Sequence, residues 1–492
     1  MNFLRIKNEV AVKREMIPDI TPEKLSAETA RMCNDQKRIV SLFGSREGAG
    51  VRIYSVLADD ETSSLYVSSA LVKEGGSYPS ITPQLLSAQF FEREIYEEFG
   101  IIPEGHPWLK PVRYPKNAAD KNLKMEDYPF FIMEGKQVHE VAVGPVHAGV
   151  IEPGHFRFMC TGEKVHHLEI QLGYQHRGVE KMMKEKDSVF LSESIAGDTV
   201  IGHSLAYCSA KEALSGTEVS DSAQAVRAVM LELERAAVHI GDLSALAGDI
   251  AYLPGNAVFG AIRTMIINTS LAICGSRFGR GIIRPGGVVF GIDGDMQEQI
   301  NNTLDVNEKK IDLMCSVMFE ASSVLSRMQT TGTVDKKTAE EIGMTGMAAR
   351  ASGYEVDCRA DHPFGAYTHV PVHKRGMKSG DVFARAYLRY VEIKQSFKLI
   401  RELMDYNRNT NLIADMKPQQ PSMFVVSLTE GWRGEISHCV ITDKEGKIER
   451  YKIKDPSFNN WLALALAVRG NGISDFPLCN KSFNLSYCGF DL

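Results

Sequence analysis

The chain has 492 residues, with 56 basic and 62 acidic side chains and a formal net charge of −6. Its content of 44% hydrophobic, 24% charged and 8% aromatic residues is ordinary for a soluble globular protein and excludes a disordered, collagenous or coiled-coil rod protein. A single core stops growing near ~250–300 residues, so at least two domains are expected. The mildly acidic balance gives no electrostatic reason to propose nucleic acid as a partner.

The first eighty residues predict a small α+β unit. Short β-rich runs at 38–46, 50–58 and 63–72 are separated by turn residues. A helix is then predicted from Thr82, as its cap, and Pro83 to Gly100, because apolar residues recur at helical spacing between them. The acidic face of this helix is interpreted as solvated surface; its members are Glu92, Glu94, Glu97 and Glu98.

The following segment, 103–140, is rich in Pro, Lys and Asp and predicts a linker or an extended arm that wraps a neighbour. Paired strands are predicted at 155–160 and 165–174, and helices dominate from 178 to 415. Strands return at 430–455 and a final helix covers 459–468. The fold class is therefore α+β, with a small N-terminal α+β domain followed by a large, mainly helical domain with peripheral β-hairpins.

No window offers eighteen uninterrupted apolar residues; the best candidate, 257–274, is broken by four polar residues. No transmembrane helix is expected, and the N-terminus lacks the apolar core of a signal peptide. The nine cysteines are odd in number, scattered, and never arranged as C-x-x-C, which favours free thiols in a reducing cytosol.

Several local motifs resemble one family. The stretch 91–101, followed by Glu104-Gly105-His106-Pro107, resembles the signature of the 30 kDa subunit of complex I, with Glu97 in place of a family aspartate. Residues 144–147 and 174–181 resemble the 49 kDa quinone-site subunit of complex I and equally the large subunit of membrane-bound nickel–iron hydrogenases. Further matches follow in the family order; they are Leu233-Glu234-Arg235 with His239, Arg284 to Val288, Asp357-Cys358-Arg359 and Arg433-Gly434-Glu435.

Fusion of the two subunits in one chain resembles the formate hydrogenlyase large subunit. The resemblance implies a 30 kDa-like domain over 1–115, a linker over 116–140, and a domain like the hydrogenase large subunit and the 49 kDa subunit over 141–492. It also implies a place on the cytoplasmic face of the cell membrane, beside a small iron–sulfur subunit and membrane-embedded antiporter-like and quinone-site subunits.

The family divides at its metal site, because a nickel–iron centre needs four thiolates. The resemblance aligns the ligand cysteines of hydrogenases with Ala196, Thr199, Ser486 and Gly489, none of which can supply a thiolate. Hydrogen chemistry at a nickel–iron centre is therefore not expected. No cofactor is assigned to this chain itself; quinone is a candidate, and an iron–sulfur cluster is expected in the partner subunit.

The remaining family positions predict a polar, ionisable cavity wall suited to proton transfer near neutral pH. Its candidate relay or quinone-cavity residues are Glu152, His147, His155, His203, Glu180, Asp357 and Arg359, with Asp198 in the same region. Arg177 matches the family arginine near the partner's cluster. Three functions stay open: an ion-coupling subunit without its own metal, a quinone-reducing subunit with His147 or His155 as proton donor, and an inactive structural subunit. In complex I a tyrosine also serves the quinone, and its position here holds Ser194.

Overall fold

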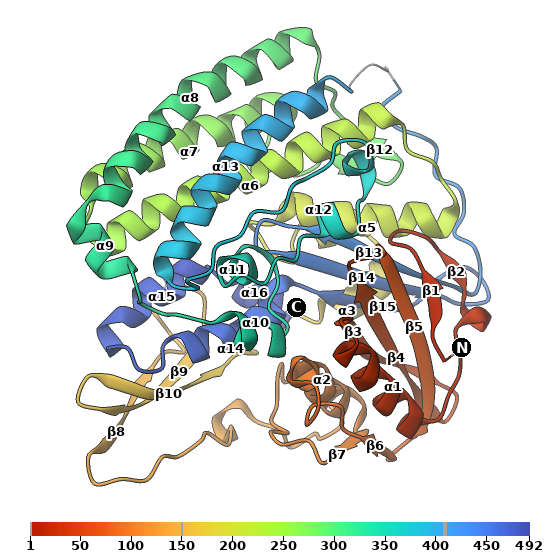
Figure 1. The fold of residues 1–492 in the computed structure, drawn as a ribbon. Helices are drawn as coiled ribbons and strands as arrows, with labels where there is room; N and C mark the ends of the chain where they lie inside the picture. The colour runs from red at the N-terminus through yellow and green to blue at the C-terminus, as the bar shows by residue number, and fades with distance from the viewer. Residues whose placement is uncertain (1, 149–150, 407–410) are drawn as a thin grey trace.

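The computed structural model describes residues 2–148, 151–406 and 411–492. In Figure 1 the N-terminal sheet, in red and orange, lies beside a C-terminal sheet in blue, and a helical bundle covers the opposite side. The N-terminal sheet is antiparallel, with strand order β1-β5-β4-β3. Its strands are β1 (Leu4–Ile6), β3 (Arg38–Glu47), β4 (Gly50–Asp59) and β5 (Ser64–Lys73), and helix α1 (Pro22–Asn34) packs against it. The three long strands confirm the three predicted runs.

Helix α2 (Gln89–Phe99) begins later than predicted, after the 3-10 turn Leu86–Ala88. Thr82 does not cap it: the backbone N–H and the hydroxyl of Thr82 donate to the Glu92 carboxylate at 3.0 and 2.5 Å. This contact turns the chain before the helix, so the predicted start is wrong by about two turns. The predicted end is confirmed, because Gly100 adopts the left-handed conformation that terminates helices (φ 72°).

The acidic face of α2 is not solvated surface, which corrects the sequence interpretation. Glu92, Glu94 and Glu97 are buried, and the side chain of Glu98 is 20% exposed. Their partners are distant in sequence, so the carboxylates form the junction between the N-terminal unit and the rest of the chain. Glu94 pairs with Arg113 and Lys452, Glu97 accepts the backbone N–H groups of Val112, Arg113 and Tyr114, and Glu98 pairs with Arg450.

The segment 103–140 is mainly extended and lies along this junction. Lys110 pairs with Glu169 at 2.6 Å, and the Arg113 guanidinium donates to the Phe490 carbonyl at 2.7 Å. The regular pieces within or beside it are β6 (Ser77–Pro79), which pairs in parallel with β7 (Ile102–Glu104), a 3-10 turn at Met125–Asp127, and β8 (Val138–Val143). The domain boundaries at 115 and 140 stay predictions.

A second antiparallel sheet has the order β15-β14-β13-β2. Its edge strand β2 (Val12–Lys13) comes from the N-terminal segment, whereas the others belong to the C-terminal part: β13 (Met423–Glu430), β14 (Glu435–Thr442) and β15 (Ile448–Lys454). The chain therefore contributes β1 to one sheet and β2 to the other within ten residues. The predicted strands at 430–455 are confirmed, with β13 preceding them.

A third sheet joins β8 to β9 (His155–Thr161) and β10 (Lys164–Gln171), which confirms the predicted hairpin. A small hairpin, β11 (Ile283–Arg284) and β12 (Gly287–Val288), turns at Gly286. The φ of Gly286 is 91°, and a Cβ there would lie 2.2 Å from the Ala414 carbonyl oxygen, so the tight turn needs glycine.

Long helices make up the bundle, which confirms the prediction that helices dominate from 178 to 415. The helices of the central part are α5 (Val200–Ser215), α6 (Asp221–Asp249), α7 (Leu253–Cys274), α8 (Gly294–Glu320), α9 (Ser322–Met328) and α13 (Val382–Met404). Short helices connect them; these are α3 (Val179–Lys186), α4 (Val189–Ser192), α10 (Lys336–Glu341), α11 (Gly346–Ala351) and α12 (Cys358–Asp361). After α14 (Pro456–Ala467) the chain forms two more helices, α15 (Phe476–Phe483) and α16 (Tyr487–Asp491), so the helix at 459–468 is not the last.

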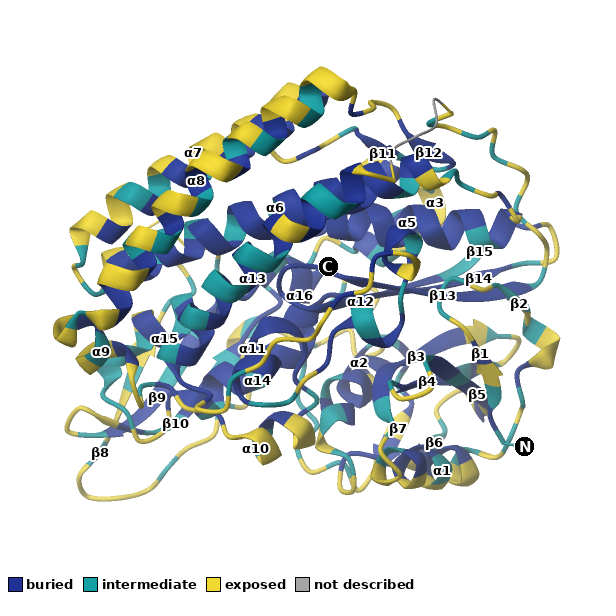
Figure 2. Ribbon diagram, turned by 45° about the horizontal axis from the view of Figure 1, so that its top comes forward, coloured by how far each residue is buried: buried dark blue, intermediate teal, exposed yellow. Residues whose placement is uncertain are grey.

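By length and composition α7 is able to cross a membrane, with a mean hydropathy of 1.6 over its most apolar window. This differs from the expectation that no helix would qualify. The helix packs against α6 and α8, yet only 39% of that window is buried, and Figure 2 shows exposed residues along α7 and α8 on the outside of the bundle. Leu253 and Met265 are among its exposed apolar side chains, at 68% and 49%.

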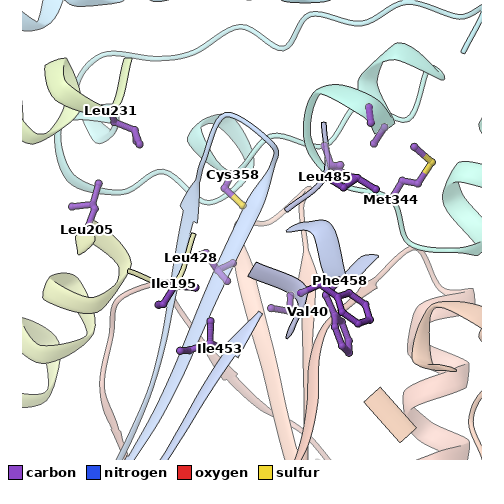
Figure 3. Close-up of a cluster of buried hydrophobic side chains, with 14 of the residues drawn as sticks. Val40, Ile195, Leu205, Leu231, Met344, Cys358, Leu428, Ile453, Phe458 and Leu485 are labelled. Carbon is purple, nitrogen blue, oxygen red and sulfur yellow. The ribbon is translucent and has the colours of Figure 1, made fainter. Parts of the chain in front are cut away.

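One continuous hydrophobic core runs through both parts of the molecule. In the view of Figure 3, Val40 of β3 lies among side chains from the C-terminal half, including Leu428, Ile453 and Phe458. All nine cysteines are free thiols, as expected, and seven of them are buried. The N-terminal unit is thus held both by apolar packing and by the ion pairs of α2.

Candidate functional site

The two chain segments that carry the degenerate ligand positions lie side by side. The Arg177 guanidinium joins them, because it donates to the backbone carbonyls of Ser194 and Ile195 (2.6 and 2.8 Å) and to that of Cys488 (3.2 Å). Arg433 makes a second link, to the Thr199 hydroxyl at 3.1 Å and to the Asn484 carbonyl at 2.5 Å. The sequence alignment of these positions with one metal site is therefore consistent with their spatial arrangement.

Side chains of this chain fill the ligand positions. The Ser486 hydroxyl accepts the Gly489 N–H at 2.9 Å and caps α16, and Ala196 is fully buried. A Cβ at Gly489 would lie 2.7 Å from Cγ of Asp455, so this carboxylate occupies the space that a cysteine side chain would need. Nickel and iron require soft thiolate donors, and these residues do not fit such a centre. No group of three or more His, Cys, Asp or Glu in the described ranges is arranged to hold a metal.

Asp455 begins a buried chain of hydrogen bonds. His203 Nε2 lies 3.0 Å from its carboxylate, His203 Nδ1 lies 3.2 Å from His438 Nε2, and His438 Nδ1 lies 2.8 Å from the Tyr451 hydroxyl. The two histidines are fully buried, and Tyr451 is 1% exposed. Each of these three hydrogen bonds carries one proton, and a carboxylate can only accept. The directions of the three bonds are then fixed: Tyr451 donates to His438, His438 donates to His203, and His203 donates to Asp455.

Burial sets the charge states along this chain. It holds the pKa of His438 well below its ordinary value, and the neighbouring His203 adds to the effect, so His438 is neutral. Burial would raise the pKa of Asp455, but the hydrogen bond from His203 and the nearby Arg433 outweigh it and lower this pKa. The result is an ionised Asp455 carboxylate and a neutral His438, joined through His203 in a row whose imidazole and phenol groups can both donate and accept a proton.

The other end of the row points toward the surface. The rings of Tyr451 and Tyr207 are nearly parallel, with centroids 6.3 Å apart, and the Tyr207 hydroxyl donates to Asp187 at 2.8 Å. The Asp187 side chain is 33% exposed and also pairs with Lys211. The stacked pair of tyrosines thus lies between the hydrogen-bonded row and a carboxylate in contact with solvent.

Arg433 fills the opposite side of the site. Its guanidinium forms a bidentate pair with Asp198, at 2.7 Å to each oxygen, and stacks on Trp432 at 3.9 Å. Trp432 Nε1 donates to the Asp198 carbonyl at 2.9 Å. Arg433 is 3% exposed in its side chain whereas Asp198 is 42% exposed, so this pair closes the site toward solvent.

The predicted site residues Glu152 and Arg177 lie at the same edge of the site, beside Cys488. Burial raises the pKa of Cys488, the Glu152 carboxylate adds to the effect, and Arg177 opposes it. His147 and His155 lie in the neighbouring loop, whose residues 149 and 150 fall outside the described ranges. His147 Nε2 contacts the Gly154 carbonyl at 2.9 Å. Burial and Arg157 lower the pKa of His155, and its Nε2 has no partner among the described residues.

Glu180, Asp357 and Arg359 are not brought to this edge. Glu180 lies in the junction, where it accepts the Ile453 N–H at 2.9 Å and pairs with Lys452 at 3.1 Å. Burial opposes ionisation, but Lys452 and Arg450 lower the pKa of Glu180 to about 2, so its carboxylate is charged.

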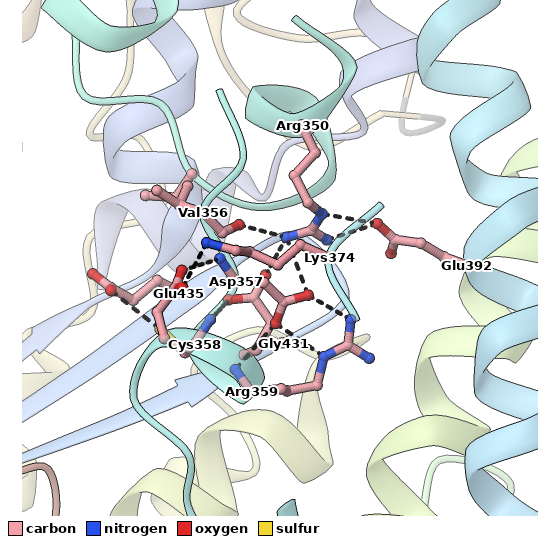
Figure 4. Close-up of polar contacts among 12 residues, drawn as sticks. Arg350, Val356, Asp357, Cys358, Arg359, Lys374, Glu392, Gly431 and Glu435 are labelled. Carbon is pink, nitrogen blue, oxygen red and sulfur yellow. Dashed lines mark hydrogen bonds and ion pairs between the residues drawn. The ribbon is translucent and has the colours of Figure 1, made fainter. Parts of the chain in front are cut away.

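Asp357 and Arg359 belong to a separate buried ionic network, drawn in Figure 4. They pair with each other at 2.7 Å, and Arg350 pairs with Glu392 at 2.7 Å and with Glu430 at 2.9 Å. All five side chains are at most 2% exposed. Such mutual neutralisation is typical of a structural network, although burial and Asp357 raise the pKa of Glu430 to about 7.

Sequence reasoning placed His203, Arg177, Glu152 and the four degenerate positions in one region, and the described geometry keeps them together. It missed Asp455, His438 and Tyr451, which complete the hydrogen-bond chain. The local sequence around Asp455 does predict a structural role, since Asp-Pro-Ser is typical of a capped helix start, and Asp455 caps α14. His438 and Tyr451 had only strand alternation, which puts both on one face of the sheet.

Two family models match the chain. Residues 18–129 match "Respiratory-chain NADH dehydrogenase, 30 Kd subunit", and residues 249–419 and 407–491 match "Respiratory-chain NADH dehydrogenase, 49 Kd subunit". Formate hydrogenlyase subunit 5 of Escherichia coli (strain K12) is 27% identical over 475 residues, which cover 91% of this chain and 83% of the relative. An NADH-quinone oxidoreductase subunit of Acinetobacter baumannii (strain AYE) is 25% identical over 485 residues, covering 86% and 81%.

A solved structure has the same fold over most of the chain. It belongs to the membrane-bound sulfane sulfur reductase, an archaeal respiratory membrane complex, and superposes with a TM-score of 0.67 at 24% identity. It covers 73% of this chain and 99% of that chain.

Proposed function

Because this chain belongs to the family that unites the 30 kDa and 49 kDa subunits of complex I and the related hydrogenase large subunits, here fused in one polypeptide, we propose that it is the large peripheral subunit of a membrane-bound oxidoreductase complex that has no nickel–iron centre in this subunit. The Asp455 carboxylate supports this most directly, because it stands where the side chain of the second C-terminal ligand would be. In place of a metal, the site holds the hydrogen-bonded pair Asp455–His203 and the ion pair Asp198–Arg433.

The chemistry that remains to these residues is proton transfer. A proton that reaches Tyr451 from the side of Asp187 allows Tyr451 to pass its own proton to His438, His438 to pass one to His203, and His203 to protonate Asp455. Each group gains one proton and loses one, so the net change is one proton at Asp455 and exchanged tautomers at both histidines. We infer that this row couples the charge state of the emptied site to the surface, and that partner subunits use the change to move ions.

The partners follow from the same proposal. A small iron–sulfur subunit would contact the edge at Arg177, where a cation favours the reduced, more negative cluster. Membrane-embedded subunits would hold the complex on the cytoplasmic face of the cell membrane. This chain would bind no cluster itself, because its nine cysteines are scattered free thiols.

Elemental mass spectrometry of the native complex, purified from membranes, tests the metal-free site. Nickel near zero, with iron in the amount that the partner's cluster requires, is the expected result. One nickel atom per chain would refute the proposal. Substitution of Ala196, Thr199, Ser486 and Gly489 by cysteine provides the comparison: nickel stays absent unless Asp455 is also replaced by alanine, since its carboxylate blocks position 489.

Quinone reduction is the second candidate, and one observation favours it. His155 Nε2 is buried without a hydrogen-bond partner in the described part of the chain, as a donor to a quinone carbonyl would be. Against it, Ser194 stands at the tyrosine position, and no described residue of the loop 147–155 lines the cavity between α2, β10 and α14 or the cavity between α2, α3 and β15. Viologen-driven reduction of decylubiquinone by the native complex, lost in His155→Gln and kept in His139→Gln, would establish this candidate. If the native complex shows no such activity, and His203→Gln leaves its proton uptake unchanged, the chain would be a structural subunit.

A further inference from the structure

A second site lies away from the degenerate metal position, in a cavity of about 330 Å³ between the two parts of the chain. Its walls come from four segments far apart in sequence: α2, the arm at 108–128, strand β10 and helix α14 with the C-terminal Phe490. A cavity of this size with mainly apolar walls and a few polar groups is typical of a small-molecule site.

Aromatic rings line the cavity on several sides. Trp108 and Tyr128 come from the arm, Phe90 from α2, and Trp461 and Phe490 from the C-terminal helices. Phe90 and Phe490 meet edge to face with centroids 5.5 Å apart. Rings arranged in this way favour a flat, apolar ring system as occupant.

The charged groups of the lining are mainly cationic. Glu169 is satisfied by Lys110 and by the Phe131 N–H, both at 2.6 Å. Arg93, 5% exposed, donates to the carbonyls of Lys110 and Pro111, lies over the Phe90 ring at 5.0 Å, and forms no ion pair with a carboxylate in the described ranges. Neutral acceptors and an aromatic ring do not neutralise the charge of this buried guanidinium, so an anionic group of a ligand would be favourable there.

The third polar feature is an orphaned donor. Arg469, exposed in the turn that follows α14, donates to His167 Nδ1 at 3.1 Å, so the neutral imidazole carries its proton on Nε2. That Nε2 is buried and has no partner among the residues the structure describes. Burial of an unpaired N–H is unfavourable, and an oxygen of a ligand between His167 and Arg469 would satisfy it.

From the aromatic walls, the two guanidinium groups and the orphaned His167 donor, we propose that this cavity binds a small planar aromatic compound that carries a carboxylate or another anionic oxygen. The site goes beyond the proposed redox function and does not depend on it. One hydrogen bond nevertheless links it to the segment of the degenerate metal position, because Trp461 lines the cavity and its Nε1 donates to the Ser486 carbonyl at 3.3 Å. A bound ligand would therefore contact a residue that is hydrogen-bonded to the segment with positions 486 and 489.

The chain contains a set of reporters for this site, because two of its three tryptophans line the cavity and Trp432 does not. The full chain is labelled with 5-fluorotryptophan, its three ¹⁹F resonances are assigned with Trp→Phe variants, and 2-naphthoate is titrated. Saturable shifts of the Trp108 and Trp461 resonances, with Trp432 unchanged, are expected. The neutral 2-naphthamide is expected to bind at least about tenfold more weakly, because a charge-assisted hydrogen bond is lost.

Arg469→Met tests the polar end of the site, with Arg277→Met as a matched control, since both arginines are exposed and are expected to tolerate replacement. The first variant should weaken naphthoate binding about tenfold, and the second should leave it unchanged. The proposal is overturned if neither cavity resonance moves at millimolar naphthoate, or if Trp432 shifts together with them. Equal binding of acid and amide, or of Arg469→Met and wild type, would also overturn it.

Discussion

Replacement of Lys452 by methionine should destabilise the protein more than any exposed substitution, because Lys452 holds the junction together. Its ammonium lies 2.5 and 2.6 Å from the two oxygens of Glu94 and 3.1 Å from Glu180, and its side chain is 2% exposed. Removal of one partner from a buried ion pair costs about 3–5 kcal/mol. Arg113 still pairs with Glu94, and Arg450 lies 3.4 Å from Glu180, so we expect the lower end, about 3 kcal/mol.

The pH dependence of the stability difference between wild type and Lys452→Met provides an independent test. In the native protein the pKa of Glu180 is lowered to about 2, so this group contributes stability above its ordinary pKa and loses it as the pH falls toward 2. Without Lys452, the buried Glu180 carboxylate takes up a proton at higher pH, which reduces the cost of burying an unpaired charge in the variant. The difference between wild type and variant should therefore narrow by about 1 kcal/mol or more between pH 7.5 and pH 5, since one pKa unit corresponds to about 1.4 kcal/mol.

Urea denaturation, followed by both fluorescence and circular dichroism, measures these differences where the two transitions coincide. Lys184→Met, an exposed lysine at the rim of the same junction, is the control and should change stability by less than about 0.5 kcal/mol. Lys452→Met combined with Glu94→Gln should recover part of the loss. A cost below about 1 kcal/mol for Lys452→Met at pH 7.5, or a cost independent of pH, would refute the reasoning.

Three further predictions concern single side chains. Gly489→Ala should destabilise by about 1–3 kcal/mol because its Cβ would lie 2.7 Å from Asp455, whereas Gly197→Ala, with open space around it, should be neutral in the same thermal scan; equal melting temperatures would contradict this. Burial raises the pKa of Glu234 to about 8, so native stability should fall as the pH rises from 4.5 through 8, and Glu234→Gln should flatten that slope in urea titrations; an unchanged slope would count against it. Glu92→Ala should cost about 3 kcal/mol or more, because four donors to its carboxylate lose their acceptor, and wild-type-like unfolding would show that these contacts do not form.

Local patterns predicted the elements well where they depend on near neighbours. The runs at 38–46, 50–58 and 63–72 are β-rich and separated by turn residues, and they form β3, β4 and β5. The end of α2 at Gly100 likewise follows from local chemistry.

The acidic face of α2 shows why other features were out of reach. Four glutamates on one helix are typical of a solvated surface, and only the tertiary fold brings Lys452 to Glu94 across 358 residues of sequence. The helix start was missed for a related reason, because Glu92 binds the Thr82 backbone that local rules assign to a cap.

The candidate site, too, was predictable from the sequence only in part. Family motifs identified His203, Arg177 and the four degenerate positions, because those residue types recur in fixed order. They could not identify His438, which contacts His203, or Tyr451, which contacts His438, because these contacts form only where β14 and β15 pair in one register beside α5. Asp357 and Arg359 were assigned to the same cavity since their motif lies within the family order, but they neutralise each other in a separate network.

The short strand β2 gives the molecule an unusual connection between its halves. Leu4–Ile6 completes the N-terminal sheet, and Val12–Lys13 completes the sheet built from residues 423–454. If the backbone were cut in the arm at 116–140, the first fragment would still supply a strand to the second. The two fragments would then associate by strand complementation and by the α2 carboxylates, so the fused gene product and a pair of separate polypeptides could share one architecture.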